Sequence, residues 1–273
     1  IDPWKNWRIN RHRYLQVLNH HTKASFSKKP DLIIWSESAT LERLSYHYKR
    51  HSEEAGQYPL FIEKVMNTIK EWKKPLLTGE IGRKDVIKGQ YFYRHYFNNA
   101  CLINDKAEVK EVYSKIHLVP FGEWFPYEKT FPFVKRLLNS FGASSFTPGK
   151  KPVLFKFKNH SFGTLICYEG IFYRLCRKYK NMGAKFLVNI TNDGWSDSYA
   201  GHMQHFSASV FRAIENGIWY VRVGNTGLTG IIDPYGRITT RIPLLVAAHL
   251  VGDLDFSYNK KTLYAFTGDI IIY

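Results

Sequence analysis

The sequence predicts a layered α/β domain, and three observations support that fold class. Short apolar runs of strand length alternate along the chain with segments whose apolar residues recur at helical spacing. Two stretches, 91–113 and 219–242, read as successive strands joined by short turns. The chain has 273 residues, 44% of them apolar, and no internal repeat or Pro/Gly/Ser-rich linker divides it. We therefore expect one domain over residues 1–273.

Local patterns of apolar residues predict where the strands and helices lie. Strands are expected at the apolar runs 32–35, 75–78, 153–155, 163–166 and 186–190. Helices are expected over 5–26, 60–73, 131–140, 170–181 and 202–216. The last helix has the clearest pattern, because Phe206, Val210 and Ile214 recur at close to the helical period.

The charge balance narrows the class of partner. The 39 Lys and Arg residues outnumber the 23 Asp and Glu residues, which gives a formal net charge of +16. Such a surface attracts anions, so nucleic acid, anionic lipid headgroups and acidic proteins are all candidates. No pattern resembles a helix-turn-helix, an RNP sequence or a zinc knuckle. The simpler alternative is that the basic residues only keep an aromatic-rich chain in solution.

Cysteine usage and hydropathy exclude further classes. Three cysteines cannot form a disulfide framework, and their spacing matches no zinc signature, so we expect neither a metal nor another cofactor. The longest nearly apolar run, 242–252, is far short of the roughly 20 residues that cross a bilayer.

Cys167 occupies a position that suits a nucleophile. It follows the strand run 163–166 and precedes a helical pattern. A helix N-terminus favours a thiolate, and its free N–H groups can stabilise an oxyanion. The simpler alternative is a core cysteine, an interpretation that suits Cys101 and Cys176 well.

A thiol nucleophile needs a base and an electrophilic partner, and two residues stand out. Glu37 follows the strand run 32–35 closely, where α/β proteins place catalytic groups. Lys115 ends a strand and enters a loop rich in Pro, Gly and aromatic residues. There it would be desolvated and would need an acidic partner. Taken singly, each is more often a solvated or salt-bridged residue.

Taken together, these residues resemble a known family. Glu37, Lys115 and Cys167, in that order and each after a strand, are similar to the Glu-Lys-Cys triad of the nitrilase (carbon–nitrogen hydrolase) superfamily. Within it, the string Lys-Ile-His-Leu-Val-Pro-Phe-Gly-Glu-Trp-Phe-Pro at 115–126 resembles the soluble domain of the bacterial apolipoprotein N-acyltransferase family. Further likeness lies at 166–169, 192–195, 204–205, 211–215, 224–227 and 233–236. The resemblance implies a nitrilase-type αββα sandwich, in which two mixed β-sheets lie face to face with helices on both outer sides.

The resemblance implies acyl transfer through a thioester. Cys167 would attack the ester of a phospholipid acyl donor while Glu37 takes its proton. Lys115 and the Tyr168 backbone N–H would stabilise the oxyanion. The acyl chain would then pass to the α-amino group of the N-terminal diacylglyceryl-cysteine of an apolipoprotein acceptor, which Glu37 deprotonates.

The resemblance also implies supporting residues. Glu123 would hold the Lys115 ammonium and tune Glu37. Glu169 and Tyr168 would orient the loop or the substrate headgroup, although Glu169 is equally well explained as a helix N-terminal acid.

Aromatic side chains are the expected substrate contacts, namely Trp124, Phe125 and Trp195. The aromatic segment 121–133 would form an interfacial lid for acyl chains, and core packing explains the same residues equally well.

The surroundings implied by the family are those of a membrane enzyme. Its members carry transmembrane helices before and after this domain, so we expect residues 1–273 to be truncated at both ends. The domain would rest on the bacterial inner membrane, facing the periplasm, as a monomer. The charge of +16 then fits anionic lipid, at about 1 kcal/mol per basic residue near the surface, and nucleic acid is no longer expected.

Two rival functions stay open at this point. A soluble nitrilase-type amidase would use the same three reactive groups on a small amide, with water in place of the amine. A binding module would use the basic face without any chemistry, and it would tolerate Cys167→Ala in the cell.

Overall fold

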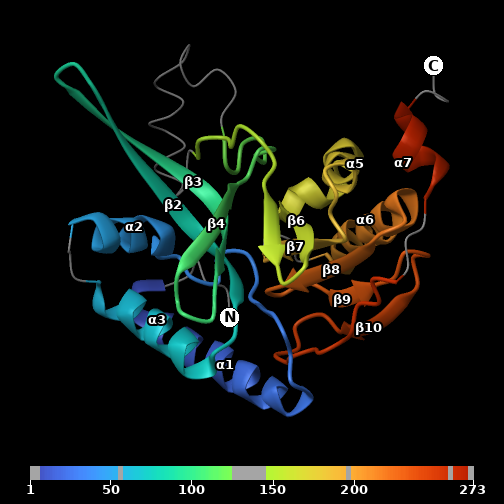
Figure 1. The fold of residues 1–273 in the computed structure, drawn as a ribbon, viewed down its shortest axis with the longest axis horizontal. Coiled ribbons are helices and arrows are strands. Elements are labelled where there is room, and N and C mark those ends of the chain that lie inside the picture. The colour runs from blue at the N-terminus through green and yellow to red at the C-terminus, as the bar shows by residue number, and fades with distance from the viewer. Residues whose placement is uncertain (1–6, 55–57, 125–145, 195–197, 258–260, 270–273) are drawn as a thin grey trace.

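The protein folds into four layers, with two β-sheets face to face and helices outside each sheet (Figure 1). The structure is a computed structural model, and it describes residues 7–54, 58–124, 146–194, 198–257 and 261–269. Both sheets mix parallel and antiparallel pairs. The predicted αββα sandwich is therefore confirmed. The helix expected at 131–140 lies outside the described residues.

The first sheet has the strand order β1-β2-β3-β4. Its strands are β1 (Ile33–Ile34), β2 (Leu76–Lys88), β3 (Tyr91–Ile103) and β4 (Val109–Ser114). β1 is parallel to β2, and the β2–β3 and β3–β4 pairs are antiparallel. β1, β2 and β4 thus run in one direction, so the residues that follow β1 and β4 emerge at the same end of the sheet.

The second sheet has the strand order β10-β9-β8-β7-β6-β5. Its strands are β5 (Leu154–Phe157), β6 (His160–Ile166), β7 (Phe186–Thr191), β8 (Trp219–Gly224), β9 (Thr229–Ile232) and β10 (Ile238–Ile242). The central strands β6, β7 and β8 are parallel, and the outer pairs are antiparallel. The turns after β6 and β7 therefore lie next to each other.

Helices cover the outer faces of the sheets. Before β2 lie α1 (Trp7–Ser25), η1 (Phe26–Lys28), α2 (Leu44–Glu54) and α3 (Leu60–Trp72). After β6 lie η2 (Cys167–Ile171), α5 (Tyr173–Asn181), α6 (Tyr199–Asn216) and α7 (Leu263–Thr267). Among the described helices, none combines the length and the hydropathy needed to cross a membrane.

Strand alternation builds three apolar clusters. Leu76 packs against α1 and α3, whereas its neighbour Leu77 packs between the two sheets. In the second sheet Ile166 lies between the sheets, whereas Leu165 packs against α5 and α6. Successive strand residues point to opposite faces, so each strand of the sandwich supplies two layers of core.

The helices expected at 5–26, 60–73, 170–181 and 202–216 correspond to α1, α3, α5 and α6, with shifted ends. The helix α2 was not predicted because its sequence has no apolar stripe. Among those of its side chains that the structure describes, Leu44 alone is fully buried. The first turn of α2 is held instead by the buried carboxylate of Glu80, which accepts the Ser45 backbone N–H at 2.7 Å. A cap from a residue on another element leaves no local sequence signal.

Candidate active site

The three residues expected to react are buried where elements of both sheets meet. Glu37 follows β1, Lys115 follows β4 and Cys167 follows β6. Their exposed fractions are 5%, 1% and 6%. The Lys115 Nζ lies 3.9 Å from Glu37 Oε1, and both groups act electrostatically on the Cys167 thiol. The fold thus brings the three side chains to one water-poor site.

Glu37 is held by two hydrogen bonds, one at each carboxylate oxygen. Oε1 accepts the Asn98 side-chain amide at 2.8 Å, and Oε2 accepts the Asn192 backbone N–H at 2.7 Å. Burial raises the pKa of the Glu37 carboxyl, and the charge of Lys115 offsets part of that effect. A fixed carboxylate with a raised pKa suits a general base that works near neutral pH.

Lys115 forms its direct ion pair with Glu123. Its Nζ lies 2.9 Å and 2.8 Å from the two Glu123 oxygens, closer than to Glu37. Burial acts to lower the pKa of Lys115, but the acidic groups around it outweigh burial and raise that pKa. The Asn98 amide also donates to Glu123 Oε1 at 2.8 Å, so it bridges the two carboxylates. The ammonium expected to need an acidic partner has one.

Cys167 sits at a sharp turn between β6 and η2. Its φ is 50°, a left-handed conformation that is uncommon for a residue with a side chain. Burial, together with the Glu37 carboxylate, raises the pKa of the thiol to about 12. The expectation that the helix start favours a thiolate is therefore wrong for the resting protein, because η2 is a short turn and burial dominates. The thiol needs a base to react.

Glu169 joins the Lys115 loop to the Cys167 turn. It is fully buried, and one of its oxygens accepts the Tyr113 hydroxyl at 2.7 Å and the Ile116 backbone N–H at 2.7 Å. The same oxygen accepts the His117 backbone N–H at 3.1 Å, and the other accepts the Ile166 backbone N–H at 2.9 Å. Burial raises the pKa of Glu169. Glu169 thus ties the end of β4 and the loop after it to the turn at Cys167.

The remaining predicted residues lie at the rim or outside the described residues. Tyr168 is half-buried, with its ring 5.1 Å from that of Phe172 in an edge-on contact. Trp124 is 42% exposed on the loop that carries Glu123. Phe125 and Trp195 lie outside the described residues.

A polar network beneath Cys167 was not predicted. The Cys167 carbonyl accepts a hydrogen bond from His205 Nε2 at 3.3 Å, so this nitrogen carries a proton. His205 Nδ1 lies 2.9 Å from the buried Asp193 carboxylate, which also accepts from Arg222 at 2.8 Å and from Thr191 at 2.9 Å. The motifs at 192–195 and 204–205 contained two of these residues, but only the fold shows that they share one network.

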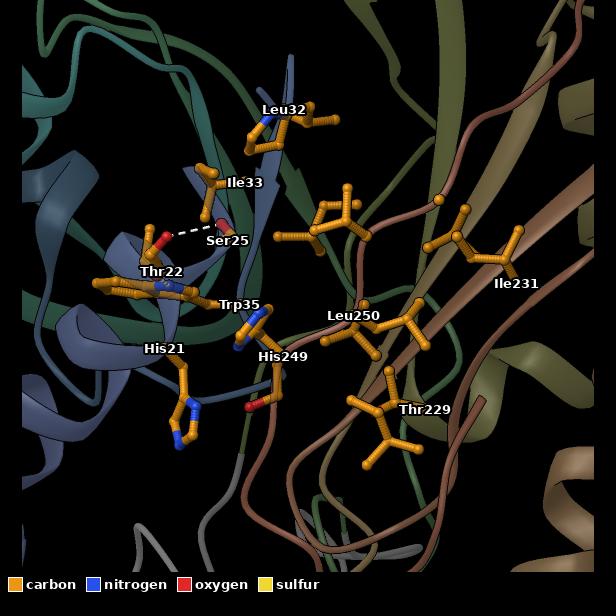
Figure 2. A pocket seen from close by; sticks show the side chains of 18 of the residues that line it. His21, Thr22, Ser25, Leu32, Ile33, Trp35, Thr229, Ile231, His249 and Leu250 are labelled. Atoms are coloured by element: carbon orange, nitrogen blue, oxygen red, sulfur yellow. Dashed lines mark hydrogen bonds between the residues drawn. The ribbon is translucent and has the colours of Figure 1, made fainter. Parts of the chain in front are cut away.

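A cavity of about 480 Å³ has Ser36, the neighbour of Glu37 in the chain, in its wall. It opens between α1, the segment around β1, the strands β8 and β9, and residues 246–256 (Figure 2). Trp35 and His249 line it, whereas Glu37, Lys115 and Cys167 do not. Within the described ranges, no three His, Cys, Asp or Glu side chains gather as a metal site would require.

Comparison with known proteins decides the family. Residues 3–262 match the family of carbon–nitrogen hydrolases. The chain belongs to this family. Solved structures of an amidase of the nitrilase superfamily from Nesterenkonia share its fold; one has a TM-score of 0.60 at 16% identity and aligns with 85% of this chain and 81% of the amidase.

Several curated relatives of similar sequence carry the name apolipoprotein N-acyltransferase. Apolipoprotein N-acyltransferase 1 of Treponema denticola is 32% identical over 98% of this chain and 52% of its own length. The apolipoprotein N-acyltransferase of Geobacter metallireducens is 34% identical over 91% of this chain and 44% of its own length. That of Borreliella burgdorferi is 32% identical over 90% of this chain and 45% of its own length. The chain thus spans about half the length of these relatives.

Proposed function

We propose that this carbon–nitrogen hydrolase domain is the acyl-transferring part of an apolipoprotein N-acyltransferase. It moves a fatty acyl chain from a phospholipid, through a Cys167 thioester, to the α-amino group of the N-terminal diacylglyceryl-cysteine of an apolipoprotein. The names of the relatives support the reaction class, since their likeness runs over 98% of the chain in one case. The buried carboxylate, ammonium and thiol at one site support the chemistry.

In the first half-reaction, Glu37 takes the thiol proton of Cys167 as the sulfur attacks the ester carbonyl carbon. This step needs the base because the pKa of the thiol is about 12. The charge that forms on the carbonyl oxygen is stabilised by the Lys115 ammonium and the Tyr168 backbone N–H. The intermediate collapses to the thioester, and the proton on Glu37 goes to the departing lysophospholipid oxygen.

In the second half-reaction, the amine of the acceptor attacks the thioester carbonyl. Glu37 takes one proton from the nitrogen, and the Cys167 thiolate leaves as the amide forms. The proton then returns from Glu37 to the thiolate, which restores the resting site. The same base thus serves both directions of proton transfer.

Glu123 and Glu169 are positioning residues in this proposal, because they act through Lys115 and the backbone. Glu123 holds the Lys115 ammonium, at 2.8 Å from its nearer oxygen. Glu169 fixes the loop after β4 to the turn at Cys167 through backbone N–H groups on both. Trp124, Phe125 and Trp195 would contact the acyl chain or the headgroup.

The proposal includes the setting of the domain. Residues 1–273 act as one domain without a cofactor or nucleic acid, as a monomer, on the periplasmic side of a bacterial inner membrane. The net charge of +16 supports a position against anionic headgroups.

Intact mass spectrometry tests the reaction. The protein, expressed from its complete gene, is incubated with phospholipid micelles beside Cys167→Ala. We expect an adduct of acyl size that is absent from the variant and is removed by a diacylglyceryl-cysteinyl peptide. Steady hydrolysis of small amides without any adduct would identify an amidase instead. A folded protein with neither activity would leave a binding module.

Lys115→Ala in the same assay tests the oxyanion role. Removal of one oxyanion donor lowers the rate about 100- to 1,000-fold. Acyl-enzyme formation near the wild-type rate would refute that role.

A further inference from the structure

The strands β2 and β3 continue as a two-stranded ribbon beyond the first sheet (Figure 1). They pair without interruption from Leu76 with Ile103 to Lys88 with Tyr91. β4 pairs with β3 only from residue 99 onward. Residues 80–98 therefore form a ribbon whose free end has no further strand beside it among the described residues. A two-stranded ribbon is marginal in water by itself, so its long exposed end calls for an explanation.

The end of the ribbon exposes large apolar side chains on both of its faces. Ile87 is 73% exposed, Tyr91 64%, Phe92 52% and Tyr93 47%. Ile87 lies opposite Phe92 in the pairing register, so these two share one face. Tyr91 and Tyr93 share the other face, with ring centroids 6.5 Å apart. A protein partner with a flat surface would cover only one face of the ribbon. The headgroup layer of a bilayer would surround the tip and cover both faces.

The same end carries a basic excess. Residues 83–94 hold four basic residues and one acidic residue, which gives +4 − 1 = +3. The single acid, Asp85, is already paired with Arg83 at 2.7 Å. Lys84, Lys88 and Arg94 are exposed, and the Arg94 guanidinium lies 5.3 Å from the centre of the Phe92 ring. Aromatic rings interleaved with Lys and Arg are the composition that suits the water–lipid interface.

The base of the ribbon lies next to Glu37. At its base, Gly79 lies so close to the Glu37 backbone that a Cβ on Gly79 would be 2.8 Å from the Glu37 Cα. Asn98, on the paired strand, bonds both Glu37 and Glu123. From Gly79 the strand runs nine residues further to Lys88, roughly 30 Å at about 3.3 Å per residue. Contact at the tip therefore orients the end of the sandwich that holds the thiol.

We propose that the ribbon tip, residues 86–93, inserts into the headgroup region of an anionic bilayer. Ile87, Phe92 and the two tyrosines enter the interface, and Lys84, Lys88 and Arg94 pair with lipid phosphates. The proposal deepens the proposed function, because it names the surface with which the domain meets its phospholipid. It can fail separately, since binding to vesicles is measured without any acyl transfer.

Vesicle flotation of the 273-residue chain tests the charges. Vesicles of phosphatidylcholine with phosphatidylglycerol are compared with phosphatidylcholine alone. The triple variant Lys84→Gln/Lys88→Gln/Arg94→Gln should bind the anionic vesicles on the order of 100-fold more weakly, at about fivefold per basic residue. The matched control, Lys70→Gln/Lys178→Gln/Lys185→Gln, removes three exposed lysines elsewhere and should change binding less than fivefold. Equal losses in both variants would mean that the overall charge of +16 does the binding, and would overturn the proposal.

A probe at the tip tests insertion. Gln90→Cys, labelled with an environment-sensitive fluorophore, should shift to the blue on anionic vesicles, whereas the same label at the exposed Lys156→Cys should not. Ile87→Ser/Phe92→Ser should lose at least tenfold in vesicle binding, and Tyr199→Ser/Phe211→Ser, an equally exposed pair on α6, should not. No shift at residue 90 would refute insertion. A dimer in light scattering that the tip variant abolishes would replace the bilayer by a second copy of the chain.

The two proposals are separated by acyl-enzyme formation in micelles. If tip variants lose vesicle binding but still form the adduct in micelles, both proposals stand. Wild-type chain that inserts its tip but never forms the adduct would refute the acyl transfer and leave the membrane contact.

Discussion

Lys115→Met tests whether the reactive site is as desolvated as its geometry indicates. The Lys115 side chain is 1% exposed, and its removal leaves Glu37 and Glu123, 7% and 15% exposed, without their cation. Breaking a buried ion pair by removal of one partner costs about 3–5 kcal/mol. At about 2–4 °C per kcal/mol for a domain of this size, the melting temperature should fall by about 6–20 °C.

Urea unfolding at pH 7.5, with a matched control, measures this cost. Lys23 forms an exposed ion pair with Glu71 at 2.9 Å, so Lys23→Met should cost about 0–1 kcal/mol. The double variant Lys115→Met/Glu123→Gln should recover part of the loss, because one uncompensated carboxylate is removed. Burial already raises the pKa of the Glu37 carboxyl, and loss of the Lys115 charge removes the effect that partly offsets burial. Glu37 should therefore take up a proton more readily in the folded variant. The loss in free energy of unfolding caused by Lys115→Met should then become smaller as the pH falls from 8 to 5.

A deficit for Lys115→Met no larger than that for Lys23→Met would refute the reasoning. It would mean that water reaches the Lys115 ammonium in solution. An oxyanion role that depends on a dry site would then lose its physical basis.

Three further predictions concern the groups that surround the thiol. Glu37→Gln should abolish acyl-enzyme formation, yet it should lower the pKa of the Cys167 thiol below about 12, because the Glu37 carboxylate helps to raise that pKa. The rate of alkylation by iodoacetamide, measured against pH, checks the change in pKa. The same pH profile in wild type and variant would contradict it. Gly79→Ala should lower the free energy of unfolding by about 1–3 kcal/mol and lower activity, since its Cβ would be 2.8 Å from the Glu37 Cα. The control is Gly122→Ala, which should be tolerated because the nearest atom to its Cβ would be 3.5 Å away. Asp193→Asn leaves the buried Arg222 without its counter-ion and should cost about 3–5 kcal/mol in urea unfolding. Burial acts to raise the Asp193 pKa, but His205 and Arg222 outweigh burial and lower that pKa. The stability that the Asp193 carboxylate contributes is therefore present above about pH 4 and lost below it. The difference in free energy of unfolding between wild type and Asp193→Asn should become smaller in acid.

The alternation of elements could be predicted from sequence, and so could three residues that the structure buries at one site, because each has a local signal. Glu37 and Cys167 directly follow apolar strand runs, and Lys115 stands in a distinctive loop. The partners of these groups have no such signal. Asn98 is one of two neighbouring asparagines within a strand, and only the pairing of β2, β3 and β4 directs its amide to Glu37 and Glu123.

Electrostatics depended on the fold even more strongly. A cysteine at a strand-to-helix turn suggested a thiolate, but the balance between burial, carboxylate and ammonium is a property of the packed site.

The length of the ribbon was missed for a related reason. β3 lies within the stretch 91–113 that was expected to form strands, but the strand expected at 75–78 stops ten residues short of the end of β2 at Lys88. Residues 83–88 are mostly charged and have no fully buried side chain, so they lack the alternation that predicts a strand.

The backbone of Cys167 has a consequence for selection. At a φ of 50° glycine is unstrained, whereas most other L-residues cost about 1–2 kcal/mol. Cysteine at position 167 therefore carries a backbone cost that Cys101, within the extended strand β3, does not carry. Under the mechanism that we propose, the chemistry of the thiol is kept against this backbone cost, as a trade-off between stability and activity.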